Sequence, residues 1–183
     1  MINRRLLRVL IVALISALIG GGWGLGKLSQ KDRYKNNKDG YFRVLDVHDG
    51  DTLTIIFSGK RERVRLIGID APELDQKPWG VRAKRNLEGL LSSSDMDIRL
   101  EFDVEERDKY GRLLAYVWTK DGRLINRVML EEGYAVLLTI PPNIKYVDEF
   151  KRAQASARAS KRGIWGRGGL RQSPSEFRKT HRW

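Results

Sequence analysis

Apolar and polar residues alternate in five short stretches of the chain, which is the pattern of half-buried β-strands. In the second stretch, Leu53, Ile55 and Phe57 occupy every other position. Turn signals such as Asp49-Gly50 lie between neighbouring stretches. The pattern predicts strands near residues 42–47, 52–57, 64–69, 98–102 and 113–117.

Three other segments have the ends and spacing of helices. Pro78 fits the first turn of a helix that continues through Leu91. A second helix is expected at about residues 124–132, with Gly133 at its C-cap, and a third at residues 147–162. One helix after the third of five strands predicts a mainly β fold with α-helices, namely a five-stranded OB-type barrel with about three helices.

The N-terminal segment has a different pattern. Arg4, Arg5 and Arg8 precede an uncharged run at residues 9–26. This predicts an N-terminal apolar helix at residues 1–26, either a cleaved signal peptide or an uncleaved membrane anchor. A buried core helix is disfavoured, because no polar residue between Val9 and Ile15 gives the run an outward face. Basic residues favour the cytoplasmic side, so the domain is expected to be exported: membrane-anchored facing outside the cytoplasm, or secreted or periplasmic after cleavage.

Charge and composition divide the rest of the chain. Residues 27–40 have the composition of a polar linker, residues 41–166 of a folded domain, and residues 167–183 of a basic, flexible tail. The net charge is +12, and residues 151–183 alone hold ten basic residues against one acidic residue. Such a basic end favours polyanions such as nucleic acid, although a solvated tail that only aids solubility is the common alternative.

The missing residue types exclude several kinds of chemistry. The chain has no cysteine and two histidines, His48 and His181. Disulfides, thiolate metal sites and cysteine nucleophiles are therefore excluded, and a histidine-based metal site or a Ser/His/Asp triad is disfavoured. The remaining candidates for chemistry are carboxylates and arginines.

Two groups of acids lie where predicted strands begin or end. Asp49 and Asp51 flank a glycine turn, and Asp70 and Glu73 follow the third strand with Pro72 between them. Proline stiffens the second loop, and hard cations such as calcium take oxygen ligands from carboxylates and carbonyls. Taken alone, the first group is more often only a turn with soluble ends, whereas plain surface acids are a weaker explanation for the second group, because the strand before it is otherwise so apolar.

Two arginines accompany these acids. Arg65 lies on the face of its strand opposite Leu66, and Arg112 follows the turn Asp108-Lys109-Tyr110-Gly111 at the start of the fifth strand. Surface positions are the plain alternative for both. Phosphodiester hydrolysis requires a cation, guanidinium groups that bind two phosphate oxygens, and a base that orients water. The acids and arginines together provide that set.

At this point the chain resembles a known family. The segments "DGDT", "RLIGIDAPE", "DKYGRLLAYV" and "RGIW" occur in this order between about residues 42 and 165, roughly two-thirds of the chain. Together they resemble the staphylococcal nuclease (thermonuclease) family, whose fold is a five-stranded OB-type barrel with three helices. The resemblance implies a calcium-dependent endonuclease that hydrolyses DNA and RNA and leaves 3′-phosphate products.

The resemblance also assigns roles to residues. Asp51 and Asp70 match the calcium carboxylate ligands, and Ala71 falls where a backbone carbonyl completes the site. Arg65 and Arg112 match the two phosphate-binding arginines. Glu73 matches the proposed general base, and Asp49 is expected in the outer shell. No protein partner is expected, and the protein is expected to be a monomer.

Two departures separate this chain from the best-known member. The loop at residues 74–78 is short. In residues 134–142, where Tyr134 is the one aromatic residue, the tyrosines that contact the nucleotide in that member are not evident. Tyr110 is present, and Tyr146 is expected in a core or helix-face role rather than in base stacking. The alternatives are a non-catalytic nucleic-acid- or protein-binding OB-fold module anchored at the membrane, and a membrane-anchored structural protein. Neither accounts for the five acids and arginines together.

Overall fold

The computed structural model describes residues 40–181. The expected signal peptide or anchor at residues 1–26, with its apolar helix, and all of the linker except Gly40 lie outside the described residues. Within residues 40–181, none of the helices combines the length and apolar character needed to cross a membrane.

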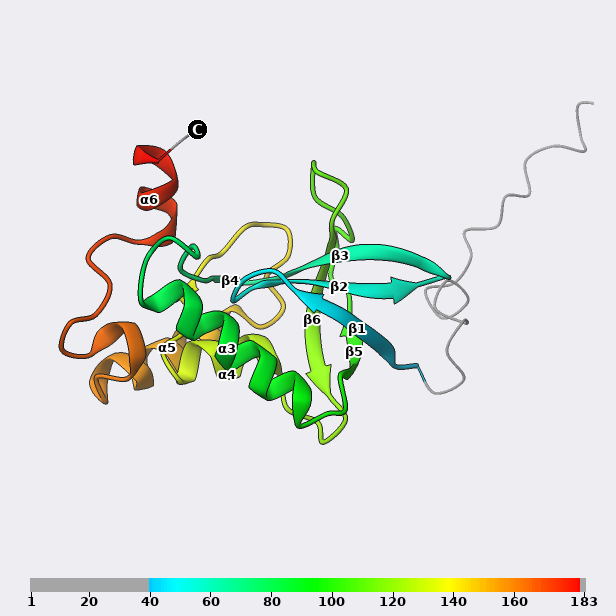
Figure 1. The fold of residues 1–183 in the computed structure, drawn as a ribbon, viewed down its shortest axis with the longest axis horizontal. Helices are drawn as coiled ribbons and strands as arrows, with labels where there is room; N and C mark the ends of the chain where they lie inside the picture. The colour runs from blue at the N-terminus through cyan, green and yellow to red at the C-terminus, as the bar shows by residue number, and fades with distance from the viewer. Residues whose placement is uncertain (1–39, 182–183) are drawn as a thin grey trace, which may run out of the picture. The chain divides into compact units, whose positions relative to one another are not determined.

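Five strands form a closed barrel (Figure 1), so the predicted fold class is confirmed. Its neighbours follow the order β1-β2-β3-β6-β5, and β5 pairs with β1 to close it. Only β3 and β6 pair in parallel among these neighbours. The strands are β1 (Phe42–Val47), β2 (Thr52–Phe57), β3 (Lys60–Leu66), β5 (Asp97–Glu101) and β6 (Leu113–Thr119).

The three predicted helices are present as α3 (Trp79–Ser92), α4 (Ile125–Glu131) and α5 (Val147–Ala159). α4 contacts α3, α5 and strand β6, and α3 also contacts strand β1, so the helices pack on the barrel through α4 and α3 (Figure 1). Gly133 follows α4 with a φ of +73°, as the C-cap prediction requires. A Cβ there would lie 2.4 Å from the carbonyl oxygen of Arg162, so the glycine also allows the chain after α5 to approach.

The third strand ends earlier than the alternation predicts. β3 stops at Leu66, because Gly68 turns the backbone with a φ of +80°. Gly68 also lies against the Phe150 ring, since a Cβ at this position would be 2.5 Å from a ring carbon. The next residues form β4 (Ile69–Asp70), which pairs with β7 (Val136–Leu137) in a separate two-stranded sheet. Asp70 therefore leaves the barrel and is held by this second sheet.

The basic tail contains a helix that its composition did not predict. After the short 3-10 helix η1 (Gly163–Trp165), α6 spans Pro174–Thr180. The Ser173 hydroxyl accepts a hydrogen bond from the backbone N–H of Glu176, and the Glu176 carboxylate accepts one from the backbone N–H of Ser173. This reciprocal capping fixes the start of α6.

Candidate active site

One pocket of about 660 Å³ is lined by all six residues that the sequence assigned to the site. The pocket is bounded by the end of β3, the short strand β4, the turn before β6 and the segment after β7. The six residues are Asp51, Arg65, Asp70, Ala71, Glu73 and Arg112.

Asp51 is a buried carboxylate at the start of β2. One of its oxygens accepts a hydrogen bond from the backbone N–H of Ala71 at 2.7 Å, and the other accepts one from the Thr52 hydroxyl at 3.0 Å. Burial raises the pKa of Asp51 above its usual range, although the charge of Arg65 acts in the opposite direction. A nearby cation would therefore stabilise the ionised form of this buried carboxylate.

The turn before Asp51 is packed tightly. A Cβ on Gly50 would lie 2.7 Å from the Cβ atoms of both Ala71 and Ala83, so only glycine lets the turn approach β4 and α3 this closely. Asp49, expected outside the ligand set, accepts a hydrogen bond from the backbone N–H of Asp51 at 2.9 Å. Asp49 therefore orients the Asp51 backbone.

Arg65 joins two carboxylates of the site. Its Nε lies 3.1 Å from Asp51 Oδ1, and its Nη2 lies 3.3 Å from Asp70 Oδ1. Its remaining nitrogen donates to the carbonyl oxygen of Leu66 at 2.6 Å. The arginine is thus fixed between the two proposed metal ligands, with its side chain largely buried.

Glu73 lies in the short turn between β4 and α3. The Gln76 side-chain oxygen accepts a hydrogen bond from the backbone N–H of Glu73 at 3.0 Å, and the backbone N–H of Gln76 donates to the Glu73 carbonyl at 2.8 Å. The Glu73 side chain is 36% exposed, whereas that of Asp70 is 2% exposed. Of these two acids, Glu73 is therefore the one that water can reach readily.

Arg112 enters the pocket from the turn before β6. Its Nε donates to Asp108 at 2.7 Å, and Asp108 also accepts from the backbone N–H groups of Tyr110 and Arg112. Burial raises the pKa of Asp108, but the hydrogen bonds from Arg112 outweigh it and the net pKa lies below the usual range. Asp108 therefore stays ionised and holds Arg112 in place.

The aromatic residues near the pocket differ in role. Tyr110 is 73% exposed and lines the pocket, with the Arg112 guanidinium 5.7 Å from its ring centroid. Tyr146 packs its ring against Tyr116 at 4.7 Å and donates its hydroxyl to Glu101 at 3.0 Å. Tyr146 is half-buried at the start of α5 and does not line the pocket, in agreement with the expected core or helix-face role, whereas Tyr110 offers an exposed ring to a nucleotide.

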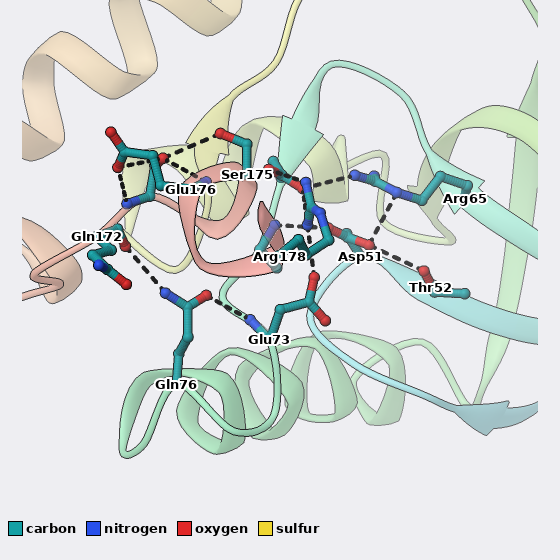
Figure 2. A network of polar contacts seen from close by, with 12 residues as sticks. Asp51, Thr52, Arg65, Glu73, Gln76, Gln172, Ser175, Glu176 and Arg178 are labelled. Carbon is teal, nitrogen blue, oxygen red and sulfur yellow. Dashed lines mark hydrogen bonds and ion pairs between the residues drawn. The ribbon is translucent and has the colours of Figure 1, made fainter. Parts of the chain in front are cut away.

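Arg178 also lines the pocket, although no sequence pattern assigned it to the site. This residue of α6 donates to both Asp70 oxygens, at 2.9 and 3.1 Å. It also donates to Glu73 Oε1 at 2.6 Å, and Figure 2 shows these two side chains pointing toward each other. Although burial acts against it, these hydrogen bonds raise the pKa of Arg178. The capping-box pattern beginning at Ser173 could have revealed the helix, but no local pattern connects Arg178 with Asp70, 108 positions away.

The donor set at this site fits a hard cation. Asp51 and Asp70 are buried carboxylates that contact the same guanidinium, and the Ala71 backbone lies directly against Asp51. Within residues 40–181, no three or more Asp, Glu or His side chains cluster closely enough to hold a metal ion by themselves. A calcium ion here would therefore take two carboxylates and complete its oxygen shell with a carbonyl, water and substrate.

The chain matches known proteins over this same region. A family model described as "Staphylococcal nuclease homologue" matches residues 63–167. The "Thermonuclease" of Staphylococcus intermedius is 38% identical over 167 residues, which is 88% of this chain and 95% of that protein. Two Bacillus subtilis (strain 168) proteins, "Endonuclease YncB" and "SPbeta prophage-derived endonuclease YokF", are each 39% identical over 128 residues, or 66% of this chain.

This chain spans 59% of the length of YncB and 42% of that of YokF. The match to the S. intermedius protein, in contrast, covers nearly the full length of both chains. The family model includes Arg65, Asp70, Glu73 and Arg112, and it ends before α6. The barrel and the pocket agree with the family model and with the match to the S. intermedius protein, and together they show that this chain belongs to the staphylococcal nuclease family.

Proposed function

We propose that this protein is a calcium-dependent endonuclease that hydrolyses phosphodiester bonds of DNA and RNA and leaves 3′-phosphate products. The observation that carries the proposal is that Asp51, Arg65, Asp70, Glu73 and Arg112 line one pocket. These residues combine oxygen ligands for a hard cation, two guanidinium groups and a water-accessible carboxylate. Relatives named thermonuclease and endonuclease support the same activity.

Each residue has a distinct role in the proposed reaction. Arg65 and Arg112 bind the equatorial phosphate oxygens, because a guanidinium group offers two parallel donors. Glu73 accepts a proton from water, whose oxygen bonds to phosphorus. The bond from phosphorus to the 5′ oxygen breaks, that oxygen takes up a proton from solvent, and the phosphate stays on the 3′ oxygen. Calcium held by Asp51, Asp70 and the Ala71 carbonyl would place positive charge against a non-bridging oxygen.

The pocket also bears on the substrate. Besides Tyr110, the apolar residues Leu138 and Ile140 line it, and Ile140 is 61% exposed. Aliphatic side chains contact any base without hydrogen-bond readout, so recognition rests mainly on the phosphates. This favours cleavage of both DNA and RNA with little sequence preference.

A non-catalytic binding module is the second candidate. One observation favours it: Arg65 and Arg178 already compensate the charges of Asp51, Asp70 and Glu73 without a metal ion. This arrangement could be stable as a purely structural ion-pair network. The two candidates differ in whether calcium starts hydrolysis.

The test is a digestion of plasmid DNA and of RNA by the purified protein with calcium, with magnesium and with excess chelator. We expect cleavage of both substrates with calcium, weaker cleavage with magnesium, and no cleavage with chelator. Analysis of the product ends should find phosphate on the 3′ side. Full activity in excess chelator would contradict the metal assignment, and no activity under any condition would favour the binding module.

We further propose that the domain acts outside the cytoplasm, as a monomer that meets nucleic acid there. Support comes from the three N-terminal arginines and the apolar run at residues 9–26. A fusion of residues 1–40 to a reporter that is active only in the periplasm should be active. A reporter that stays inactive would refute export.

A further inference from the structure

Arg178 binds Asp70 and Glu73, the two acids to which the proposed reaction assigns metal binding and proton transfer. Its two terminal nitrogens bind Asp70 through both carboxylate oxygens, and one of them also donates to Glu73 (Figure 2). Both oxygens that Asp70 would offer to a metal ion are therefore bound, and so is Oε1, one of the two Glu73 oxygens that would face a water molecule. The planar fork of arginine matches this two-oxygen geometry.

The tail that carries Arg178 has a built attachment to the domain. The Gln76 side-chain nitrogen donates to the carbonyl oxygen of Gln172 at 3.1 Å, and the Trp79 indole N–H donates to that of Gly168 at 3.2 Å. Gln76 is buried, and its oxygen also accepts from the Glu73 backbone. The segment before α6 is therefore anchored to the turn that presents Glu73, which directs Arg178 into the pocket.

The helix itself is weakly held. α6 has seven residues, and Pro174 is its one buried residue. Helices this short are marginally stable in water without tertiary contacts. The ion pairs of Arg178 must therefore supply much of the free energy that docks α6, and their loss should release it.

A calcium ion and the Arg178 guanidinium compete for one place. Calcium ligands lie at about 2.3–2.6 Å from the ion, so calcium at Asp70 would lie against the guanidinium that now holds both Asp70 oxygens. Two like charges at such a distance repel each other strongly in a partly buried site. Beside the contact of Asp70 with Arg65, the charge of Asp70 is thus compensated either by Arg178 or by the metal ion.

We propose that α6 is an autoinhibitory latch, in which Arg178 holds Asp70 and Glu73 in the metal-free protein and is displaced when calcium binds. This inference rests on the proposed function, because it takes Asp70 as a metal ligand and Glu73 as the base. The latch adds a second effect of calcium: the ion completes the site and also releases Glu73 from its contact with Arg178. The apparent calcium affinity is reduced, because part of the binding free energy is used to undock α6.

The test measures calcium binding to the full chain by calorimetry, without substrate. Arg178→Ala should bind calcium about tenfold more tightly than the wild type, within the usual range of coupling between sites. Lys179→Ala is the matched control, because Lys179 is the next basic residue of the same helix and is exposed. This control removes the same charge and should change the affinity by about twofold or less. Circular dichroism checks that both variants fold.

A second measurement separates the latch from simple charge removal. Hydrogen exchange of residues 174–180 in the wild type should become faster when calcium replaces chelator, because α6 undocks. Equal calcium affinity of wild type and Arg178→Ala, or weaker binding by the variant, would overturn the latch while leaving the calcium site intact. Unchanged or slower exchange of α6 with calcium would overturn it as well. No calcium binding by any variant would overturn both the latch and the proposed metal dependence.

Discussion

Arg65 and Arg178 show how differently two residues of one site can be inferred. Arg65 lies between the apolar residues Val64 and Leu66, five positions before Asp70, so the sequence alone suggests that the pair lies together. Arg178 contacts the same carboxylate although it lies 108 positions away in the sequence. It belongs to a helix whose capping residues are its one clear sequence signal. Local spacing therefore predicts the residues around Asp70, whereas the tail contact depends on tertiary packing.

Glu101 provides a residue-scale test outside the pocket. Burial raises its pKa, but hydrogen bonds from Lys145, Tyr146 and Trp118 outweigh this and lower it below 4.5. Because the folded-state pKa is lowered, the stabilisation is present above the unfolded pKa and is lost as pH falls through the folded value. Glu101→Gln should reduce the free energy of unfolding at pH 7 by about 1 kcal/mol, after screening by solvent.

Urea unfolding of wild type and Glu101→Gln at several pH values checks this expectation. The difference between the two proteins should shrink as the pH is lowered below 4.5. A difference in the free energy of unfolding that stays constant between pH 7 and pH 3 would show that the Glu101 charge contributes nothing to stability. The natural control is Asp46→Asn, because the Asp46 side chain is 55% exposed and should have little effect at any pH.

At the scale of elements, the barrel strands follow from alternation and the helices from their ends. The short strands β4 and β7 were missed, because two residues are too few to show a period. The consequence is functional, since β4 carries Asp70. The predicted third strand, which continued to Ile69, would place Asp70 on the barrel. In the structure, the turn at Gly68 instead brings Asp70 to the second sheet.

Helix α3 offers a matched pair of glycines. A Cβ on Gly80 would lie 2.0 Å from the carbonyl oxygen of Glu73, so alanine there must displace the Glu73 backbone. Gly80→Ala should destabilise the fold by about 1–3 kcal/mol and lower turnover. A Cβ on Gly89 meets no atom within 4 Å, so Gly89→Ala should stabilise α3 by up to about 1 kcal/mol with turnover unchanged.

Thermal unfolding and hydrolysis rates of the two variants test this difference. If Gly80→Ala folds as stably as wild type and cleaves at the same rate, the contact between α3 and the Glu73 turn is not important. Loss of activity in Gly89→Ala would point instead to a general sensitivity of α3.

At the scale of the whole molecule, the charge is concentrated at the two ends. Residues 41–150 hold 17 basic and 20 acidic residues, whereas residues 151–183 hold ten basic residues and one acidic residue. The tail is therefore expected to supply much of the nonspecific attraction to nucleic acid. The pairs of Arg178 with Asp70 and Glu73 change this expectation in one respect, because that charge is already compensated in the docked helix.

Two other tail arginines, Arg167 and Arg171, are exposed and suit a salt-dependence test. The double variant Arg167→Ala/Arg171→Ala should bind single-stranded DNA less tightly in chelator. The slope of the logarithm of affinity against the logarithm of salt should fall by about 0.7 for each lost phosphate contact. Fluorescence anisotropy at several salt concentrations measures this slope. An unchanged slope would mean that these arginines only solvate the tail.

The action of Arg65, Arg112 and Glu73 on the phosphate in this pocket is the core of the proposed function. It is tested most directly by the rate of DNA hydrolysis at saturating calcium for wild type, Arg65→Lys, Arg112→Lys and Glu73→Gln. Each variant is first checked for folding by circular dichroism. We predict that each folds and loses about 100- to 1,000-fold in turnover, because lysine lacks the bidentate fork and glutamine cannot accept the proton. Wild-type turnover in all three folded variants would contradict the assigned site.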